Sequence, residues 1–309
     1  MADTDHQLII IGGGPAGLTA GLYAARDRLQ VILVEKGVVG GQVLVTDWID
    51  NYPGFPDGVS GADLIEKIAA QAKRFELETK NANVVKLELT EEEKKLTFES
   101  GEELTCQALI ICTGARPNKL DIPGEQELTG KGVSYCGTCD GPFFKDQEIV
   151  VVGGGDTAIQ EADFLTKFAS KVTVIHRRDE LRATKVLQEK AFVNKRIEFI
   201  WNANVAAIEG AKEVERVKIR SNNGDESEIA VSGVFILIGT VPNNEVLPLE
   251  QLGVDESGFV ITDDEMQTKV PGVMAAGDIR SKRVRQIINA AGEGAVAAIA
   301  AEHYLNKSD

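Results

Sequence analysis

The sequence predicts an α/β protein made of two Rossmann-like dinucleotide-binding domains of the three-layer ββα type, the second inserted into the first. Two glycine-rich loops, starting at Gly12 and Gly153, each follow a short apolar run and precede a helical pattern. The two halves also repeat at matched spacing, because Glu35 and His176 each follow the first loop glycine by 23 residues. The length of 309 residues exceeds that of one ordinary domain.

The first half opens with a predicted strand, a tight turn and a helix. Residues 8–11 are continuously apolar, as expected for a strand buried in a parallel sheet, and Gly12, Gly14 and Gly17 follow them. This spacing favours a tight turn into the helix. The amide groups of the turn and of the first helical turn would then face a phosphate. The next strand is predicted at residues 31–34 and ends in Glu35.

The second half repeats this order. The apolar residues 149–152 lead into Gly153, Gly155 and Ala158, and a second strand at residues 172–175 ends in His176. Each half also closes with a similar apolar segment that ends in Pro-Asn, at residues 109–118 and 234–243. An internal duplication of one Rossmann-like unit explains these matches.

Each half contains an alternating, charge-rich region before its closing strand, at residues 84–98 and 204–231. Residues 91–95 and 222–225 are typical of hairpin turns. We therefore expect a small antiparallel meander in each half, and we interpret its charge runs as solvated faces.

Two groups of prolines and glycines mark where the chain crosses between the domains: Pro117, Pro123 and Gly124, then Pro242 and Pro248. We expect a discontinuous first domain at residues 1–115 and 246–309, and an inserted domain at residues 116–245. The returning segment contains Ala-Ala-Gly-Asp at residues 275–278 and a helix predicted from about residue 286 to residue 304.

The residue that ends the second strand of each half distinguishes the two ligands, because it lies near the adenosine ribose. Glu35 accepts hydrogen bonds from free ribose hydroxyls and repels a 2′-phosphate, whereas His176, Arg177 and Arg178, followed by Arg182, form a fork for a phosphate dianion. The alternative for this fork is a solvated basic turn. We expect NADPH rather than NADH at the second loop.

The first loop then holds FAD. Residues 40–42 and 51–54 offer amides and close backbone approach, and Asp278 follows a glycine at a strand end, where it would accept from ribityl hydroxyls. The helix that begins near Gln286 would direct its amides at negative charge on the flavin. The alternative for each of these features is an ordinary turn or cap.

Cys136 and Cys139 form a Cys-x-x-Cys pair just before the second loop, a spacing typical of redox-active thiols beside βαβ units. Zinc is the competing interpretation, but it needs four ligands, and Cys106 and Cys112 lie around an apolar strand where they would pack as small hydrophobic residues. No metal site is expected. Asp140 suits a general acid for a leaving thiolate, with a surface acid as the alternative.

Composition limits the partners and the compartment. The formal charge of −15 argues against nucleic acid and anionic membranes. The N-terminus is acidic where a secretory leader is basic, and no stretch approaches the about 20 apolar residues that span a bilayer. We expect a cytoplasmic protein, in which structural disulfides are rare.

Eight motifs follow one another along the chain: G-G-G-P-A-G at Gly12, G-G-Q at Gly40, N-Y-P-G at Asn51, C-G-T-C-D-G at Cys136, G-G-G-D-T-A at Gly153, H-R-R-D-E-L-R-A at His176, A-A-G-D at Ala275 and R-Q at Arg285. In this order they resemble the low-molecular-weight thioredoxin reductases over essentially the whole chain. The resemblance implies an FAD-containing homodimer that reduces thioredoxin with NADPH. It further implies that one domain rotates between the two half-reactions.

The resemblance also assigns roles. It makes Cys139 the sulfur nearest the flavin, Cys136 the sulfur that attacks the thioredoxin disulfide, and Asp140 the acid. The implied FAD contacts are Gly12, Gly13, Gly14, Pro15, Ala16, Gly17, Glu35, Lys36, Gly41, Gln42, Asn51, Val84, Gly114, Asp278, Arg285, Gln286 and Ile287. The implied NADPH contacts are Gly153, Gly155, Asp156, Thr157, Ala158, His176, Arg177, Arg178, Arg182 and Gly239.

Two positions depart from the family pattern. Gly137 stands where alanine is usual, which would loosen the cysteine segment and shift its redox balance. Val284 replaces an aromatic residue before Arg285. Two other functions stay open: a reductase of a different dithiol protein, and a flavin-binding redox sensor without turnover.

Overall fold

The computed structural model describes residues 4–46, 48–91 and 93–307, and the chain divides into two compact units. Unit 1 comprises Met1–Arg116 and Val241–Asp309, and unit 2 comprises Pro117–Thr240. The crossings therefore lie one and five residues away from the predicted divisions at 115/116 and 245/246.

The second division differs because unit 1 holds residues 243–245 in place. The backbone N–H of Asn243 donates to the Gly114 carbonyl (3.0 Å), and its side-chain amide donates to the Thr113 carbonyl (2.8 Å). Arg116 also forms an ion pair with Glu245 at 2.7 Å.

Unit 1 contains a large mixed sheet, helices and short connecting elements. They are β1 (His6–Ile11), α1 (Pro15–Arg26), β2 (Val31–Glu35), the 3-10 helix η1 (Gly41–Val45), α2 (Gly61–Lys73), β3 (Glu78–Asn81), β4 (Val84–Leu89), β5 (Lys94–Phe98), β6 (Glu103–Ile111), β7 (Ala115–Pro117), β16 (Thr240–Pro242), α6 (Leu249–Leu252), β17 (Val273–Ala275) and α7 (Ile287–Lys307). β7 and β16, which span the two crossings, pair as a two-stranded sheet.

The sheet of unit 1 has the order β3-β2-β1-β6-β5-β4, with β17 also paired to β6. β3, β2, β1, β6 and β17 pair in parallel, whereas β4, β5 and β6 form the predicted antiparallel meander. β6 serves both parts, because its first half pairs with β5 up to Cys106 and its second half pairs with β1 up to Ile111. The carboxyl ends of β1, β2 and β17 therefore share one edge of the sheet.

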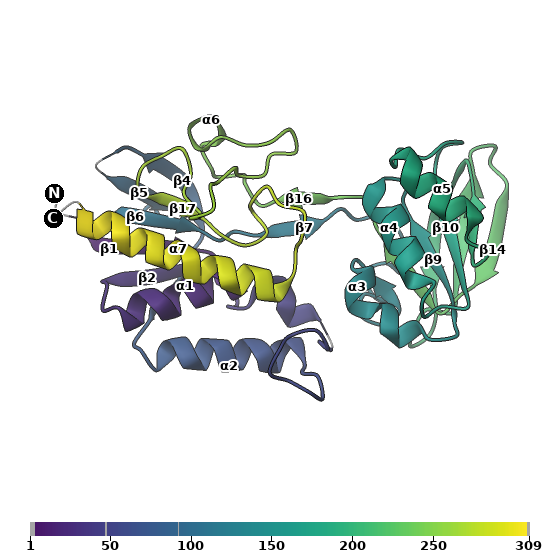
Figure 1. The fold of residues 1–309 in the computed structure, drawn as a ribbon, viewed down its shortest axis with the longest axis horizontal. Coiled ribbons are helices and arrows are strands. Elements are labelled where there is room, and N and C mark those ends of the chain that lie inside the picture. The colour runs from purple at the N-terminus through teal and green to yellow at the C-terminus, as the bar shows by residue number, and fades with distance from the viewer. Residues whose placement is uncertain (1–3, 47, 92, 308–309) are drawn as a thin grey trace. The chain divides into compact units, whose positions relative to one another are not determined.

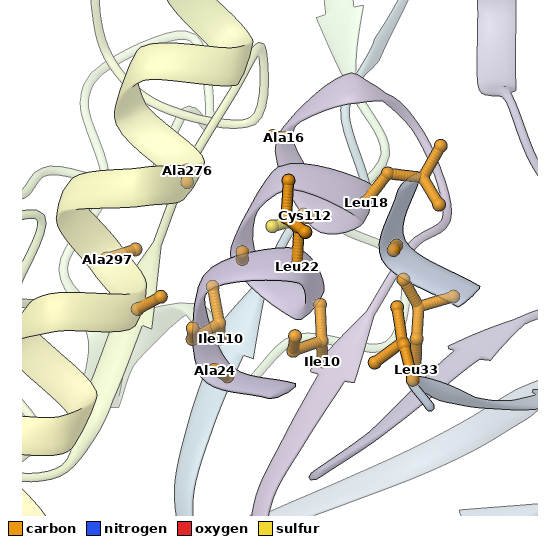
Figure 2. Packing of buried hydrophobic residues seen from close by; sticks show 14 of the residues in the cluster. Ile10, Ala16, Leu18, Leu22, Ala24, Leu33, Ile110, Cys112, Ala276 and Ala297 are labelled. Atoms are coloured by element: carbon orange, nitrogen blue, oxygen red, sulfur yellow. The ribbon is translucent and has the colours of Figure 1, made fainter. Parts of the chain in front are cut away.

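The helices α1, α2 and α7 cover one face of this sheet, and α7 lies along α1 (Figure 1). The two helices approach closely because Gly294 packs directly against the carbonyl of Ala16. Figure 2 shows Cys112 among Leu22, Ile110 and neighbouring apolar side chains between these layers. Cys106 is buried in the core on the opposite face, so both single cysteines pack as hydrophobic residues, as expected.

Unit 2 repeats the strand-turn-helix plan. Its elements are β8 (Val133–Ser134), α3 (Gly137–Asp140), the 3-10 helix η2 (Gly141–Phe144), β9 (Glu148–Val152), α4 (Asp156–Leu165), β10 (Lys171–Ile175), α5 (Lys185–Val193), β11 (Ile197–Ile200), β12 (Ala203–Glu209), β13 (Arg216–Ser221), β14 (Glu226–Ala230) and β15 (Gly233–Ile236). The parallel sheet has the order β11-β10-β9-β15-β8, and the predicted second meander is a separate antiparallel sheet, β12-β13-β14.

One core of unit 2 lies between the parallel sheet and the helices α4 and α5, and the other lies between this sheet and the meander. Unit 2 is thus a three-layer ββα unit, visible in Figure 1 as α4 and α5 on one side of β9 and β10, and β14 on the other. Within the described ranges, no helix is both long and apolar enough to cross a membrane.

Candidate functional site

The first glycine loop is shaped for close approach of a ligand. Gly12 has a φ of 104°, and a Cβ there would collide with the Cys112 carbonyl. A Cβ on Gly14 would meet no atom within 4 Å, and Gly14 caps α1 without a capping side chain. The first amides of α1 therefore face open space beside a residue without a side chain, which is the arrangement that suits a pyrophosphate.

Glu35, at the end of β2, binds this loop. Its carboxylate accepts the N–H of Gly13 at 2.7 Å and the N–H of Gly37 at 3.0 Å. Residues 40–42, which were predicted to contact the flavin, lie beside the first glycine loop. Gly40 donates its N–H to the Gly13 carbonyl (2.8 Å), and an added Cβ on Gly41 would touch Gly14.

The returning segment of unit 1 joins the same edge of the sheet. Gly277 packs so closely on Ala16 that an added Cβ would lie 2.9 Å from the Ala16 Cβ, and Asp278 follows it. The Asn51 side chain donates to the Gln286 side chain at 3.1 Å, although the two residues are 235 positions apart. The structure thus brings together predicted flavin contacts from the loop, from η1 and from the start of α7.

Three buried polar atoms near these segments lack a hydrogen bond: Thr113 Oγ1, Asp278 Oδ1 and Arg285 Nε. Lys282 Nζ lies 3.2 Å from Asp278 Oδ1 as an ion pair, outside hydrogen-bond geometry. Burial raises the pKa of the Asp278 carboxyl, and the charges of Lys282 and Arg285 oppose this rise. A polar ligand that reaches these atoms would supply the missing hydrogen bonds.

Residues 280–285 contain four basic side chains, and two of them form ion pairs inside unit 1. Arg280 and Lys282 pair with Glu293 at 2.9 and 3.1 Å, and all three side chains are at least 86% buried. The Arg285 guanidinium stacks 4.1 Å from the centre of the Phe259 ring. Two of the four positive charges of this segment are therefore paired inside unit 1, whereas Arg283 is exposed, as is Val284.

The second glycine loop repeats the geometry of the first. Gly155 caps α4 without a capping side chain, and an added Cβ there would meet nothing within 4 Å. Asp156 accepts the N–H of Thr184 at 2.7 Å. The N–H of Arg182 donates to the Gly154 carbonyl at 2.8 Å, which fixes the basic segment beside the loop.

His176 occupies the position of Glu35 in the repeat, but it is buried rather than exposed to a ligand charge. Its ring packs against Gly154, only 5% of the residue is exposed, and Nε2 has no hydrogen-bond partner. Burial lowers the pKa of the imidazole, a hydrogen bond with the Glu180 backbone opposes this shift, and the charges of Arg182 and Arg178 add to it. The positive charge of the fork therefore comes from the exposed arginines Arg177, Arg178 and Arg182.

The closing strand of each half, β6 in unit 1 and β15 in unit 2, leads into a segment that contacts the glycine loop of that half. Gly12 abuts Cys112 and Gly153 abuts Leu237, so Gly114 and Gly239 each lie two residues beyond a loop contact. The start of β4 also lies close to Glu35, because Ala82 donates its N–H to the Glu35 carbonyl at 3.0 Å, two residues before Val84.

Cys136 and Cys139 form a disulfide, with their Cα atoms 5.3 Å apart. Cys136 caps α3, and its N–H donates to Ser134 Oγ at 3.1 Å. The pair and Asp140 are half-buried. In the part of the chain that the structure describes, no group of three or more His, Cys, Asp or Glu side chains is arranged to hold a metal ion.

Sequence reasoning missed Glu161 of α4, which contacts the cysteine segment. Its carboxylate accepts the N–H of Gly137. The only signal in the sequence is that Glu161 borders the buried stripe of Ala158, Ala162 and Leu165 on its helix.

Comparisons with known proteins agree with this geometry. Residues 6–294 match the family model described as pyridine nucleotide-disulphide oxidoreductase. The chain is 44% identical to a thioredoxin reductase of Bacillus subtilis (98% of this chain, 95% of the relative) and 46% identical to one of Listeria innocua (98% and 94%). A solved thioredoxin reductase of Streptococcus pyogenes is similar with a TM-score of 0.93 at 44% identity, covering 98% of both chains.

Proposed function

Because this chain belongs to the thioredoxin reductases of the pyridine nucleotide-disulphide oxidoreductase family, we propose that it uses FAD and NADPH to reduce the disulfide of thioredoxin. The observation that carries this proposal is the Cys136–Cys139 disulfide in the unit that holds the second glycine loop. A thiol pair next to a dinucleotide loop is the arrangement that passes electrons between a nucleotide and a protein disulfide.

Unit 1 fits FAD. The open space at Gly14, the Glu35 carboxylate at the strand end, and two buried atoms without a hydrogen bond, Asp278 Oδ1 and Arg285 Nε, offer groups for a pyrophosphate, a ribose and a polar chain. When bound, FAD accepts a hydride from NADPH and passes the electrons on to a disulfide.

Unit 2 fits NADPH. Gly155 leaves room for the pyrophosphate, and Arg177, Arg178 and Arg182 offer charge for the 2′-phosphate. A neutral His176 beside them avoids the repulsion that a carboxylate such as Glu35 would exert on that phosphate.

The two cysteines then carry the electrons to the substrate. Once the pair is a dithiol, the Cys136 thiolate attacks the thioredoxin disulfide and forms a mixed disulfide. Cys139 attacks Cys136, the pair is again a disulfide, and the two substrate sulfurs leave as thiols with two protons. Asp140 supplies a proton to a leaving thiolate. We propose that one domain rotates between the half-reactions, since the flavin set and the cysteines belong to different units.

We also propose a cytoplasmic homodimer. Ile288, Val296 and Ile299 are exposed along α7, and Tyr23 of α1 is exposed as well, although they are apolar or aromatic. A second copy of the chain would bury such a surface.

The experiment that tests the proposed function follows NADPH oxidation by the purified protein with oxidised thioredoxin. We expect steady turnover that stops when thioredoxin is omitted. Flavin reduction without transfer to thioredoxin, but with transfer to another dithiol protein, would indicate a different partner. A bound flavin with no NADPH-dependent disulfide reduction would indicate a sensor instead.

A further inference from the structure

The cysteine segment contacts α4 at two points, one on each side of Cys139. The Gly137 N–H binds the Glu161 carboxylate, and Gly141 packs against Leu165, where an added Cβ would lie 2.9 Å from a Leu165 methyl group. The two contacts are spaced alike, because Gly137 and Gly141 are four residues apart on the segment and Glu161 and Leu165 are four residues apart on α4. The Leu165 contact is the ordinary apolar kind, whereas the Glu161 contact places a carboxylate in a largely buried position.

A buried carboxylate is unfavourable unless something compensates for its lost hydration. Burial raises the pKa of the Glu161 carboxyl, the Gly137 N–H opposes this rise, and the charge of Asp140 adds to it. A glutamine would fill this place on α4 and accept the same Gly137 N–H without the cost of a buried charge. The carboxylate is therefore not explained by packing of α3 on α4.

We propose that Glu161 is a positioning residue for the redox pair: by binding the amide that follows Cys136, it fixes this sulfur and disfavours its thiolate. This role rests on the proposed function, because it matters only if the pair is opened and closed. A thiolate is destabilised by a nearby like charge. The dithiol form is then less stable, so the pair becomes a stronger reductant, and the Cys136 thiolate becomes more nucleophilic.

Gly137 is the other partner in this contact. A Cβ on this residue would collide with the Glu161 carboxylate and would lie 3.2 Å from its Cβ. The glycine at this position therefore permits the carboxylate to reach the amide, and alanine would push it away. This contact gives a structural reason for the departure from the family pattern at Gly137.

The test measures the thiols directly, without NADPH or thioredoxin. In the reduced holoenzyme, the rate of Cys136 alkylation by iodoacetamide is followed against pH by mass spectrometry. We expect Glu161→Gln, which keeps the shape and an acceptor but loses the charge, to lower the apparent thiol pKa by about half a unit or more. Gly137→Ala shifts it in the same direction, and the double variant shifts it no further.

A second readout is the equilibrium with dithiothreitol at pH 8. Dithiothreitol gives two electrons and two protons, its own disulfide closes, and the Cys136–Cys139 bond opens to two thiols. Removing the carboxylate charge stabilises the dithiol, so we expect the equilibrium constant to move toward it about threefold to tenfold, or about 15 to 30 mV.

Glu189→Gln is the matched control, because it removes one carboxylate from the exposed surface of α5 in the same unit. An alkylation profile and an equilibrium for Glu161→Gln that equal those of Glu189→Gln would overturn the proposal. Failure of the proposed function is distinguishable, since it shows as absent thioredoxin reduction by the wild-type protein whatever the alkylation profiles are.

Discussion

Glu35 and His176 hold the same place in the two halves and contrast in chemistry. Glu35 binds backbone amides at the first glycine loop with its carboxylate, whereas His176 is buried against Gly154 with a lowered pKa. This contrast predicts that the site at Glu35 prefers a free ribose hydroxyl, whereas the site at His176 tolerates a 2′-phosphate. The phosphate charge is then met by the exposed arginines that follow His176.

Replacement of Arg177 and Arg178 by alanine tests this assignment. We expect the KM for NADPH to rise at least about 100-fold, because each charge-assisted hydrogen bond contributes about 1.5 to 3 kcal/mol and the double variant removes two such partners. The KM for NADH should change little, since NADH lacks the phosphate. Steady-state kinetics with both nucleotides measure this split, and an equal rise for both would contradict the assignment.

Replacement of Cys139 by serine tests the order of the electron transfers. We expect flavin reduction by NADPH to persist, while thioredoxin reduction falls at least about 10³-fold, because a covalent step is removed. Rapid-mixing absorption measures the first reaction, and a thioredoxin turnover assay measures the second. Thioredoxin turnover retained at the wild-type rate would rule out this order.

At the scale of elements, the two strand-loop-helix units were predictable because their signals are local. Apolar runs, glycine spacing and strand-end residues all lie within about 25 positions of one another in each half. The contacts of Glu161, the pairing of Arg280 with Glu293 and the burial of His176 were not predictable in this way. They depend on which segments the tertiary fold brings together.

Gly14 and Gly155, the third residues of the two glycine loops, offer a matched pair of variants. An added Cβ on Gly14 or Gly155 meets no protein atom within 4 Å, and neither residue has a positive φ. Alanine should therefore cost the apoprotein only about 1 kcal/mol or less, the loss of an N-cap glycine, while it obstructs the pyrophosphate.

We expect Gly14→Ala to weaken FAD retention at least about tenfold with NADPH affinity unchanged, and Gly155→Ala to do the reverse. Flavin release on dilution and nucleotide titration measure the two affinities. Loss of both ligands in either variant would show that the loops do not act separately.

At the scale of the whole molecule, the formal charge of −15 opposes an acidic protein partner, so local positive charge is needed to guide one. Arg280 and Lys282 are paired with Glu293, whereas residues 177–185 expose four basic side chains, Arg177, Arg178, Arg182 and Lys185. We propose that this stretch steers thioredoxin as well as binding the nucleotide.

Steering predicts that kcat/KM for thioredoxin falls several-fold as ionic strength rises from about 0.01 M to 0.15 M, because the Debye length shrinks from about 30 Å to 8 Å. Lys185→Glu should lower kcat/KM at low salt and leave the KM for NADPH unchanged. A kcat/KM that does not vary with salt would count against steering.

We propose that unit 1 holds FAD, which unit 2 first reduces with NADPH and then oxidises through Cys136–Cys139. Anaerobic titration of the purified protein, followed by its visible flavin absorption, tests this claim most directly. We expect stoichiometric NADPH to bleach the flavin, NADH to do so at least about tenfold more weakly, and oxidised thioredoxin to restore the absorption. A protein without flavin absorption, or one whose flavin NADPH leaves oxidised, would contradict it.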